Sequence, residues 1–264
     1  MWRVTSGSET GTSHLIDKLP CQDACRVAQI DCPDGPVLVC VCADGAGSVA
    51  YAEVGAQLAC ADLIELCAAM LPEELPFDRF DEFHAREWCA FLRVSLQLQA
   101  NQLQASMDDL ACTLVVALIG TRRSCFFQIG DGGVVVRTQE RLQLIFPPDH
   151  GEFAETTYFL TDPDVSQHLR FTELDTSVDG LVAFTDGLES LVLSYPDFSI
   201  HNSFFEKVLA AAETTDDTTV LTNQLRQLLN SAAVNERTSD DKTLIIAARI
   251  PQRGKEDDHA STLL

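Results

Sequence analysis

Residues 37–50 read VLVCVCADGAGSVA, and this stretch decides which fold the chain adopts. Six apolar residues run into Asp44-Gly45, and small residues and then a helical pattern follow. A continuous apolar run of this length predicts a strand that is buried on both faces. We therefore expect Asp44 to lie at the end of a buried strand, with its carboxylate at the edge of the core. Gly45 lets the backbone approach whatever that carboxylate binds.

Three other aspartates occupy similar places: Asp131 in FFQIGDGG, Asp186 in LVAFTDGLES and Asp240 in TSDDKTLIIAA. An Asp-Gly pair more often marks only a chain reversal, and Asp131-Gly132 fits a tight hairpin between two apolar runs. Asp44 and Asp186 fit that interpretation less well, because no second apolar strand follows them. Clustered carboxylates repel one another unless cations hold them, and Mg²⁺ and Mn²⁺ prefer oxygen ligands. The pattern favours a site for hard metal ions.

The remaining patterns predict an α+β fold. Apolar runs predict strands at residues 2–6, 25–30, 37–42, 112–119, 124–129, 134–137, 142–146, 181–184 and 243–248. The four from 112 to 146 indicate an antiparallel meander. Helical periodicity predicts two long consecutive helices, 50–70 and 80–106, and two shorter ones, 204–212 and 220–232. Since the strands fall in runs instead of alternating with helices, antiparallel sheets covered by helices are favoured over a parallel βαβ sheet.

Apolar stripes run along both long helices. In the second helix the stripe contains Phe83, Trp88, Phe91 and Leu98. Stripes at helical spacing are usually core, so we expect these side chains to be buried and assign them no chemistry.

Two polar segments lie outside this pattern. Residues 147–179 are too long for a plain connection, so we expect a functional loop or a flap. Residues 251–264 are expected to form a disordered polar tail. Residues 1–250 would then form a single domain.

The composition limits the classes of binding partner and the cellular compartment that we expect. The formal net charge is −22, which argues against nucleic acids and anionic membranes as partners. Ten cysteines lie mostly in apolar runs and form no C-x-x-C pair, as expected of a reducing compartment. No signal peptide and no apolar run of membrane-spanning length are evident, so a cytoplasmic protein is expected.

The motifs QDA, ADGAGS, ACTLVVAL, IGDGG, FTDGLES and SDDKTLIIA occur in this order over roughly residues 5–250. This series resembles that of the metal-dependent serine/threonine protein phosphatases of the 2C type, especially compact bacterial members. The resemblance implies a central β-sandwich of two antiparallel sheets flanked by helix pairs, in four α-β-β-α layers. It also implies hydrolysis of phosphoserine and phosphothreonine on proteins by a metal-bridging water, without a phosphoenzyme.

The resemblance also implies the cofactors and the partners. Two ions of Mg²⁺ or Mn²⁺ are expected, with a third that binds more weakly. The expected partners are phosphorylated protein substrates and a cognate serine/threonine kinase system, with the chain acting as a monomer.

The resemblance assigns metal-binding roles to five residues. Asp44 matches the aspartate that bridges two ions, and Gly45 matches the glycine whose carbonyl completes one of them. Asp186 and Asp240 match the other aspartates of the first ion. Asp131 matches the aspartate that, with Asp186, holds the third ion. Asp44, Asp186 and Asp240 are therefore the expected catalytic carboxylates.

Three positions depart from the family pattern. Gln22 and Asp23, which the resemblance also places in the metal site, stand where the family has Glu-Asp. A metal-ligand position therefore carries one negative charge less. Lys18 stands where a phosphate-binding arginine often sits, and it offers a point charge instead of a bidentate grip. Ala46 stands where some members have a histidine that is proposed as general acid.

Two alternatives remain open from the sequence. The departure at Gln22 is also consistent with a catalytically weak or inactive phosphatase-like module that binds a phosphoprotein or regulates a kinase. A β-rich domain whose Asp-Gly pairs are only turns is the other alternative, and it leaves the order of six motifs without an explanation.

Overall fold

A computed structural model describes residues 1–149 and 157–250 of the chain. The remaining part of the predicted flap, 150–156, and the predicted tail, 251–264, lie outside the described residues.

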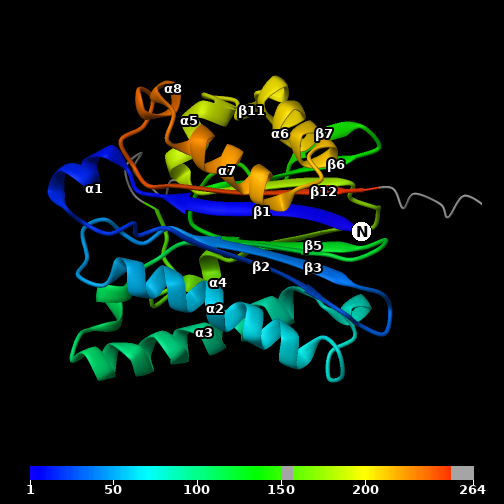
Figure 1. Cartoon of the computed structure of the whole chain (residues 1–264). Helices are drawn as coiled ribbons and strands as arrows, with labels where there is room; N and C mark the ends of the chain where they lie inside the picture. Colours follow the sequence, from blue (N-terminus) through cyan, green and yellow to red (C-terminus); the bar gives the residue numbers. More distant parts are fainter. Residues whose placement is uncertain (150–156, 251–264) are drawn as a thin grey trace, which may run out of the picture.

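The described chain forms two five-stranded antiparallel sheets that pack face to face (Figure 1). The first sheet has the order β1 (Trp2–Glu9), β12 (Lys242–Arg249), β9 (Gly180–Phe184), β6 (Gly133–Thr138) and β7 (Arg141–Leu144). The second has the order β2 (Ala24–Ile30), β3 (Val37–Ala43), β4 (Leu114–Ile119), β5 (Ser124–Ile129) and β8 (Arg170–Leu174). A short ribbon, β10 (Leu193–Ser194) and β11 (Ser199–Ile200), lies apart from both.

Helix pairs cover the outer faces of both sheets (Figure 1). Helices α2 (Ala52–Met70) and α3 (Glu82–Leu103) lie beside the second sheet, and α6 (Asn202–Thr214) and α7 (Thr218–Leu229) lie on the first. The shorter elements are α1 (Thr12–Asp17), η1 (Phe77–Arg79), η2 (Met107–Leu110), α4 (Val165–His168), η3 (Asp186–Leu188), α5 (Glu189–Val192) and α8 (Ala232–Asn235). The four-layer α+β sandwich expected from the sequence is confirmed.

Strand β3 shows why the opening stretch decides this fold. Every residue of β3 is buried. Leu38, Cys40 and Cys42 contribute to the core between the sheets, whereas Val37, Val39, Val41 and Ala43 contribute to the core beneath α2 and α3. Successive side chains of a strand point to opposite faces, so only a continuous apolar run supplies both cores at once. A third core joins α6 and α7 to the first sheet. No described helix is both long enough and apolar enough to cross a bilayer.

The meander expected between residues 112 and 146 is wrong at one point. Strands β4 and β5 pair in the second sheet, and β6 and β7 pair in the first. The connection 130–132 between β5 and β6 therefore crosses from one sheet to the other. Two glycines of this connection, Gly130 and Gly132, have positive φ angles of 84° and 79°. Asp131-Gly132 is a crossing between layers and not a hairpin turn.

The described part of the segment 147–179 contains regular elements that the sequence patterns did not predict. It contains α4 and the edge strand β8, which pairs with β5 over five residues. The polar stretch 7–23 also contains a helix, α1, which buries none of its residues. Apolar periodicity is a weak signal for such edge elements because they bury little of their surface.

The apolar stripe predicted for the second long helix is largely exposed. Of its four members only Trp88 is buried, at 4% exposure, while Phe83, Phe91 and Leu98 are 64%, 51% and 58% exposed. The buried face of α3 is instead formed by Ala85, Trp88, Cys89, Leu92, Leu96 and Ala100. The prediction was wrong because the helix has apolar residues on two faces, and only one of them meets α2 and the sheet.

Candidate active site

The strand register brings the predicted site residues to one end of the sandwich. Phe184 pairs with both Leu244 and Gly133, so the residues just beyond these positions lie together. Asp186 follows β9, Asp240 precedes β12 and Asp131 precedes β6. In the second sheet Ala43 pairs with Ala24, which places Asp44 beside Gln22-Asp23. Since the two sheets are stacked, carboxylates from both meet at their shared edge.

Three of the carboxylates form a tight cluster. Oxygens of Asp44, Asp131 and Asp186 lie within 4.8 Å of one another. They line an open cavity of about 400 Å³. The other described residues around it are Gln22, Gly45, Ala46, Gly47, Thr157, Phe159, Glu189, Ser190, Tyr195 and Asp240. Asp240 therefore faces the same cavity from the start of β12, as the sequence predicted.

Backbone contacts hold Asp44 and Gly45 in place. The amide of Asp44 donates to Thr113 Oγ1 at 3.0 Å, and its carbonyl accepts from the Thr113 amide at 2.8 Å. The Gly45 amide donates to the Gln22 carbonyl at 3.2 Å. A Cβ atom on Gly45 would lie 2.5 Å from the carbonyl oxygen of Ala52, so only glycine fits between the strand end and α2. This contact is the physical reason for glycine after Asp44.

Gln22 and Asp23 play different parts in the structure. Both are buried, at 4% and 5% exposure, but only Gln22 lines the cavity. Asp23 lies behind Asp44, and its Oδ2 accepts from the Thr185 hydroxyl at 2.7 Å. Within the described chain, Gln22 Oε1 and Asp23 Oδ1 are buried without a hydrogen-bond partner. Buried oxygen atoms in this state are costly unless a ligand meets them.

Lys18 lies outside the cavity. It terminates α1 in a left-handed conformation, with φ 59°, and its side chain is exposed. It is not among the described residues that line the cavity, and these include neither lysine nor arginine. The structure brings Gln22, Asp44, Gly45, Asp131, Asp186 and Asp240 together around the cavity, whereas Lys18 is not part of its lining.

Burial and mutual repulsion raise the pKa values of the clustered acids. Burial raises the pKa of Asp23 and of Asp186 to about 7, and the charges of Asp131 and Asp240 add to the rise at Asp186. The pKa of Asp131 also rises to about 7 through burial and the charge of Glu189. Burial, Asp23 and Asp186 raise the pKa of Asp44 well above its ordinary value. Without cations, these carboxyls compete for protons at neutral pH.

The donor set fits divalent cations that prefer oxygen. Every side chain of the cluster offers an oxygen atom, and the described lining contains no cysteine or histidine. Gln22 Oε1 adds a buried oxygen without a partner on the same side as Asp44. Mg²⁺ and Mn²⁺ take such ligands, and their positive charge would favour the ionised carboxylates against both burial and mutual repulsion.

Glu189 was missed in the sequence, although it lies in the FTDGLES motif. It is 3% exposed and lines the cavity beside Asp131 and Asp186. Its Oε1 accepts from the Gly132 amide and its Oε2 from the Tyr195 hydroxyl, both at 2.7 Å. Glu189 thus fixes the connection that carries Asp131. Its position three residues after Asp186 was the only available signal.

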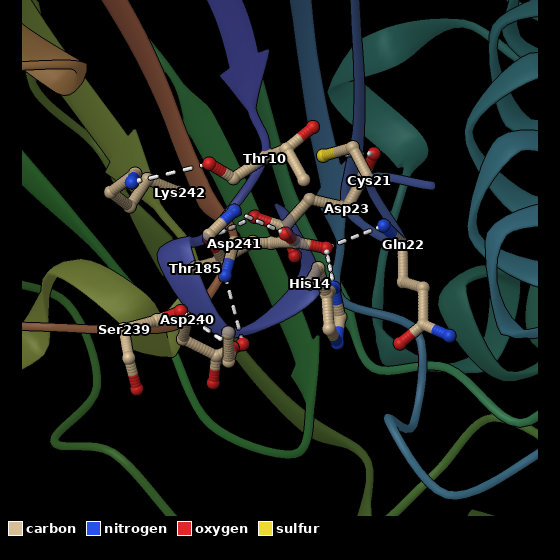
Figure 2. A network of polar contacts seen from close by, with 12 residues as sticks. Thr10, His14, Cys21, Gln22, Asp23, Thr185, Ser239, Asp240, Asp241 and Lys242 are labelled. Atoms are coloured by element: carbon tan, nitrogen blue, oxygen red, sulfur yellow. Dashed lines mark hydrogen bonds and ion pairs between the residues drawn. The ribbon is translucent and has the colours of Figure 1, made fainter. Parts of the chain in front are cut away.

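Two charged residues behind the site were also missed. Arg170, on β8, donates to the Gly130 carbonyl at 2.9 Å, and its charge favours the ionised form of Glu189. Asp241, next to Asp240, is 2% exposed and accepts hydrogen bonds from three separate groups (Figure 2). The doubled aspartate in TSDDKT was visible in the sequence, and the resemblance assigned only Asp240 to the site, but nothing there indicated the contacts that Asp241 makes.

Comparisons with known proteins agree with this architecture. Residues 10–230 match the family described as Protein phosphatase 2C. Serine/threonine-protein phosphatase 3 of Escherichia coli (strain K12) is 37% identical over 251 residues, which cover 93% of this chain and 98% of that protein.

Solved structures show the same fold. Serine/threonine phosphatase Stp1 from Staphylococcus aureus is 19% identical, with a TM-score of 0.63 over 94% of this chain and 95% of that one. The catalytic domain of the phosphatase PstP in complex with two manganese ions is also 19% identical, with a TM-score of 0.61 over 94% of this chain and 97% of that one.

Proposed function

The chain belongs to the protein phosphatase 2C family, and on this premise we propose that it hydrolyses phosphoserine and phosphothreonine on proteins with two divalent cations. The observation that carries the proposal is the cluster of Asp44, Asp131 and Asp186 oxygens in an open cavity. Its oxygen ligands suit Mg²⁺ or Mn²⁺. The two manganese ions of the PstP complex support the expected number of ions by analogy.

Each site residue receives a role in this proposal. Asp44 would contribute to holding both ions, and Asp186 and Asp240 would hold the first with it. The Gly45 carbonyl and Gln22 Oε1 serve the second, with Asp23 supporting Asp44 from behind. Asp131 and Asp186 serve a third, weaker ion. These roles follow the residue-by-residue match to the family motifs, and the cavity lining and the two partnerless oxygens support them.

Paired divalent ions, when bound, supply an activated water and neutralise charge on a phosphoryl group during in-line displacement. The protein residues position this chemistry. The rigid strand ends of both sheets hold the carboxylates, so they need little reorganisation as charge develops. Ala46 lines the cavity but has no proton to give, so proton transfer to the leaving oxygen depends on solvent. Lys18, at the surface, can attract the phosphorylated segment only over a distance.

The same proposal extends to partners and organisation. The expected substrates are phosphoproteins made by a serine/threonine kinase, and residues 1–250 act as one phosphatase domain in a monomer. The alternative of a binding module is not favoured, because Asp44, Asp131, Asp186 and Asp240 all line the cavity. A module that only binds would have no physical need for so many adjacent carboxylates.

The test is hydrolysis of p-nitrophenyl phosphate and of a phosphothreonine peptide with and without Mn²⁺. Wild type is expected to turn over only with the cation. Asp44→Asn and Asp186→Asn are expected to lose at least ~10²-fold in kcat/KM, since electrostatic groups of an active site typically contribute that much. Asp179→Asn, an Asp-Gly aspartate paired with Arg137 away from the cavity, is the matched control. Undiminished turnover in both purified site variants would refute the proposal.

A further inference from the structure

The side chain of Asp241, just before β12, contacts three residues between positions 11 and 22, more than 200 residues away in sequence (Figure 2). Its Oδ1 accepts from the Gly11 amide at 2.6 Å. Its Oδ2 accepts from the backbone amide of Gln22 at 2.5 Å and from His14 Nδ1 at 3.0 Å. A carboxylate only accepts, so Nδ1 of His14 carries the proton in this contact. The carboxylate is buried, and all three contacts are charge-assisted.

The backbone of Asp241 is fixed just as closely. Its amide donates to Asp240 Oδ1 at 2.8 Å, which orients the Asp240 carboxylate. Its carbonyl lies where a Cβ on Gly187 would approach within 1.9 Å, so the residue after Asp186 packs directly against it. A Cβ on Gly11 would come within 2.5 Å of backbone atoms of 239–240. No side chain fits at these two contacts.

These contacts connect three cavity residues to Asp241. Gln22 is held through its backbone amide, Asp240 through its carboxylate and Asp186 through the packing of the next residue, Gly187. Gln22 precedes a strand of the second sheet, and Asp186 follows a strand of the first. Asp241 itself does not line the cavity. Its position next to the ligands, and not among them, is that of a residue that orients ligands.

We propose that Asp241, with His14, is a positioning residue that sets the geometry of the cation site by fixing Gln22 against Asp240. This inference rests on the proposed function. Removing the outer partner of a metal ligand typically costs about 10–100-fold in metal affinity. The effect should be strongest at the ion next to Gln22, because Gln22 is a neutral ligand and depends on position alone.

The variant Asp241→Asn isolates this role. The amide keeps the size of the side chain, but its NH₂ group must face a backbone donor, the amide of Gly11 or that of Gln22. His14 can respond by changing its tautomer, whereas neither backbone amide can, so the contact between residues 11–22 and Asp241 is weakened in either orientation. His14→Ala keeps Asp241 and both backbone contacts, and it serves as the milder second variant. The matched control is Asp81→Asn, which removes a similar aspartate contact to His84 Nδ1 at the start of α3.

The experiment is calorimetric titration of Mn²⁺ into chelator-treated wild type and variants, with thermal unfolding and p-nitrophenyl phosphate kinetics alongside. We expect Asp241→Asn to weaken one Mn²⁺ site about ten-fold or more, and His14→Ala to weaken it less. The rise in melting temperature on adding Mn²⁺ should shrink in Asp241→Asn. At saturating Mn²⁺ most of kcat should return, with KM within about two-fold, since a positioning residue acts on the ligands and not on the substrate.

A purely structural role predicts a different result. Asp241→Asn would then melt at a lower temperature with and without Mn²⁺, with unchanged Mn²⁺ affinities, and this outcome overturns the inference. If Asp241→Asn does not fold, wild-type Mn²⁺ affinity in His14→Ala overturns it, and weakened affinity supports it. A wild type that is inert at saturating Mn²⁺ contradicts the proposed function instead, so the two failures are distinguishable.

Discussion

At the residue scale, Gln22 places a neutral side chain in the cavity where the 2C family pattern has a glutamate. Gln22 is buried beside Asp44, and its Oε1 has no hydrogen-bond partner within the described chain. An amide oxygen binds a divalent cation more weakly than a carboxylate does, because only the carboxylate adds a full charge. The second ion is therefore expected to bind more weakly than the first, and a single substitution can restore the missing charge.

We predict that Gln22→Glu lowers the Mn²⁺ concentration needed for half-maximal phosphatase activity about ten-fold, equivalent to about 1.4 kcal/mol. The measurement is a Mn²⁺ titration with a phosphothreonine peptide. Gln29→Glu, at an exposed position of β2, the strand that follows Gln22, adds the same charge away from the cavity and should leave the titration unchanged. An unchanged titration in Gln22→Glu would contradict the assignment of this side chain to an ion.

At the scale of elements, the connection between β5 and β6 does more than link two strands. It carries the chain from the second sheet to the first and places Asp131 at their common edge. Gly132 has a φ of 79°, and a Cβ there would lie 2.6 Å from the carbonyl oxygen of Phe184. Neither backbone can easily yield, because Phe184 belongs to a paired strand and Gly132 directly precedes one.

Gly132→Ala is therefore expected to lower the free energy of unfolding by more than the roughly 1–2 kcal/mol that left-handed backbone costs a residue with a side chain. Gly35→Ala is the matched comparison. Gly35 has a φ of 106°, but its Cβ would meet only the Thr121 side chain, at 2.9 Å. We expect it to cost about 1–2 kcal/mol. Urea unfolding measures both, and an equal loss in the two variants would refute the argument.

The elements also show what the sequence can and cannot predict. Both faces of β3 are apolar, so its burial and the strand end at Asp44 could be read directly. The crossing at Asp131-Gly132 could not, because a tight hairpin and a change of sheet have the same local signature of glycine and aspartate. The exposed side of α3 was misread for a similar reason: periodicity shows that a face is apolar but not whether anything covers it.

The site was easier to predict than its supports. Strand-end aspartates can be recognised in the sequence because they lie next to apolar runs, and the series of motifs assigned their roles. Glu189, Arg170 and Asp241 act through backbone amides and carbonyls of segments remote in sequence. No local pattern encodes such contacts, because their partners become neighbours only after the two sheets have stacked. Lys18 is the opposite case: the motif order predicted it as a site residue, but its side chain does not line the cavity.

At the scale of the whole molecule, the acidic cluster links stability to pH. The pKa values of Asp23, Asp131, Asp186 and Glu189 are raised to about 7, from ordinary values of 3.8 for Asp and 4.5 for Glu. Between those limits the cation-free folded protein binds more protons than the unfolded chain. The free energy of unfolding must therefore fall as pH rises through this window.

We predict that the chelated protein is less stable at pH 7.5 than at pH 5.5, and that saturating Mn²⁺ removes or reverses this trend. Bound cations keep the carboxylates ionised, so proton release on binding favours higher pH. The measurement is urea unfolding at both pH values, with chelator and with Mn²⁺. Asp131→Asn removes one of the four groups and should flatten the pH dependence of the chelated protein. A chelated wild type that gains stability with pH would contradict the raised pKa values.

The place of β12 in the first sheet has a consequence for synthesis of the protein. β12 is the last strand of the described chain, yet it lies between β1, the first, and β9. On the ribosome, β1 has no neighbour in its sheet until β12 has been translated, and Asp240 and Asp241 emerge just ahead of that strand. A nascent or prematurely terminated chain thus lacks both the middle of a sheet and part of the metal site. A chain that ends before β12 is therefore expected to have no phosphatase activity, because Asp240 is missing from the cavity.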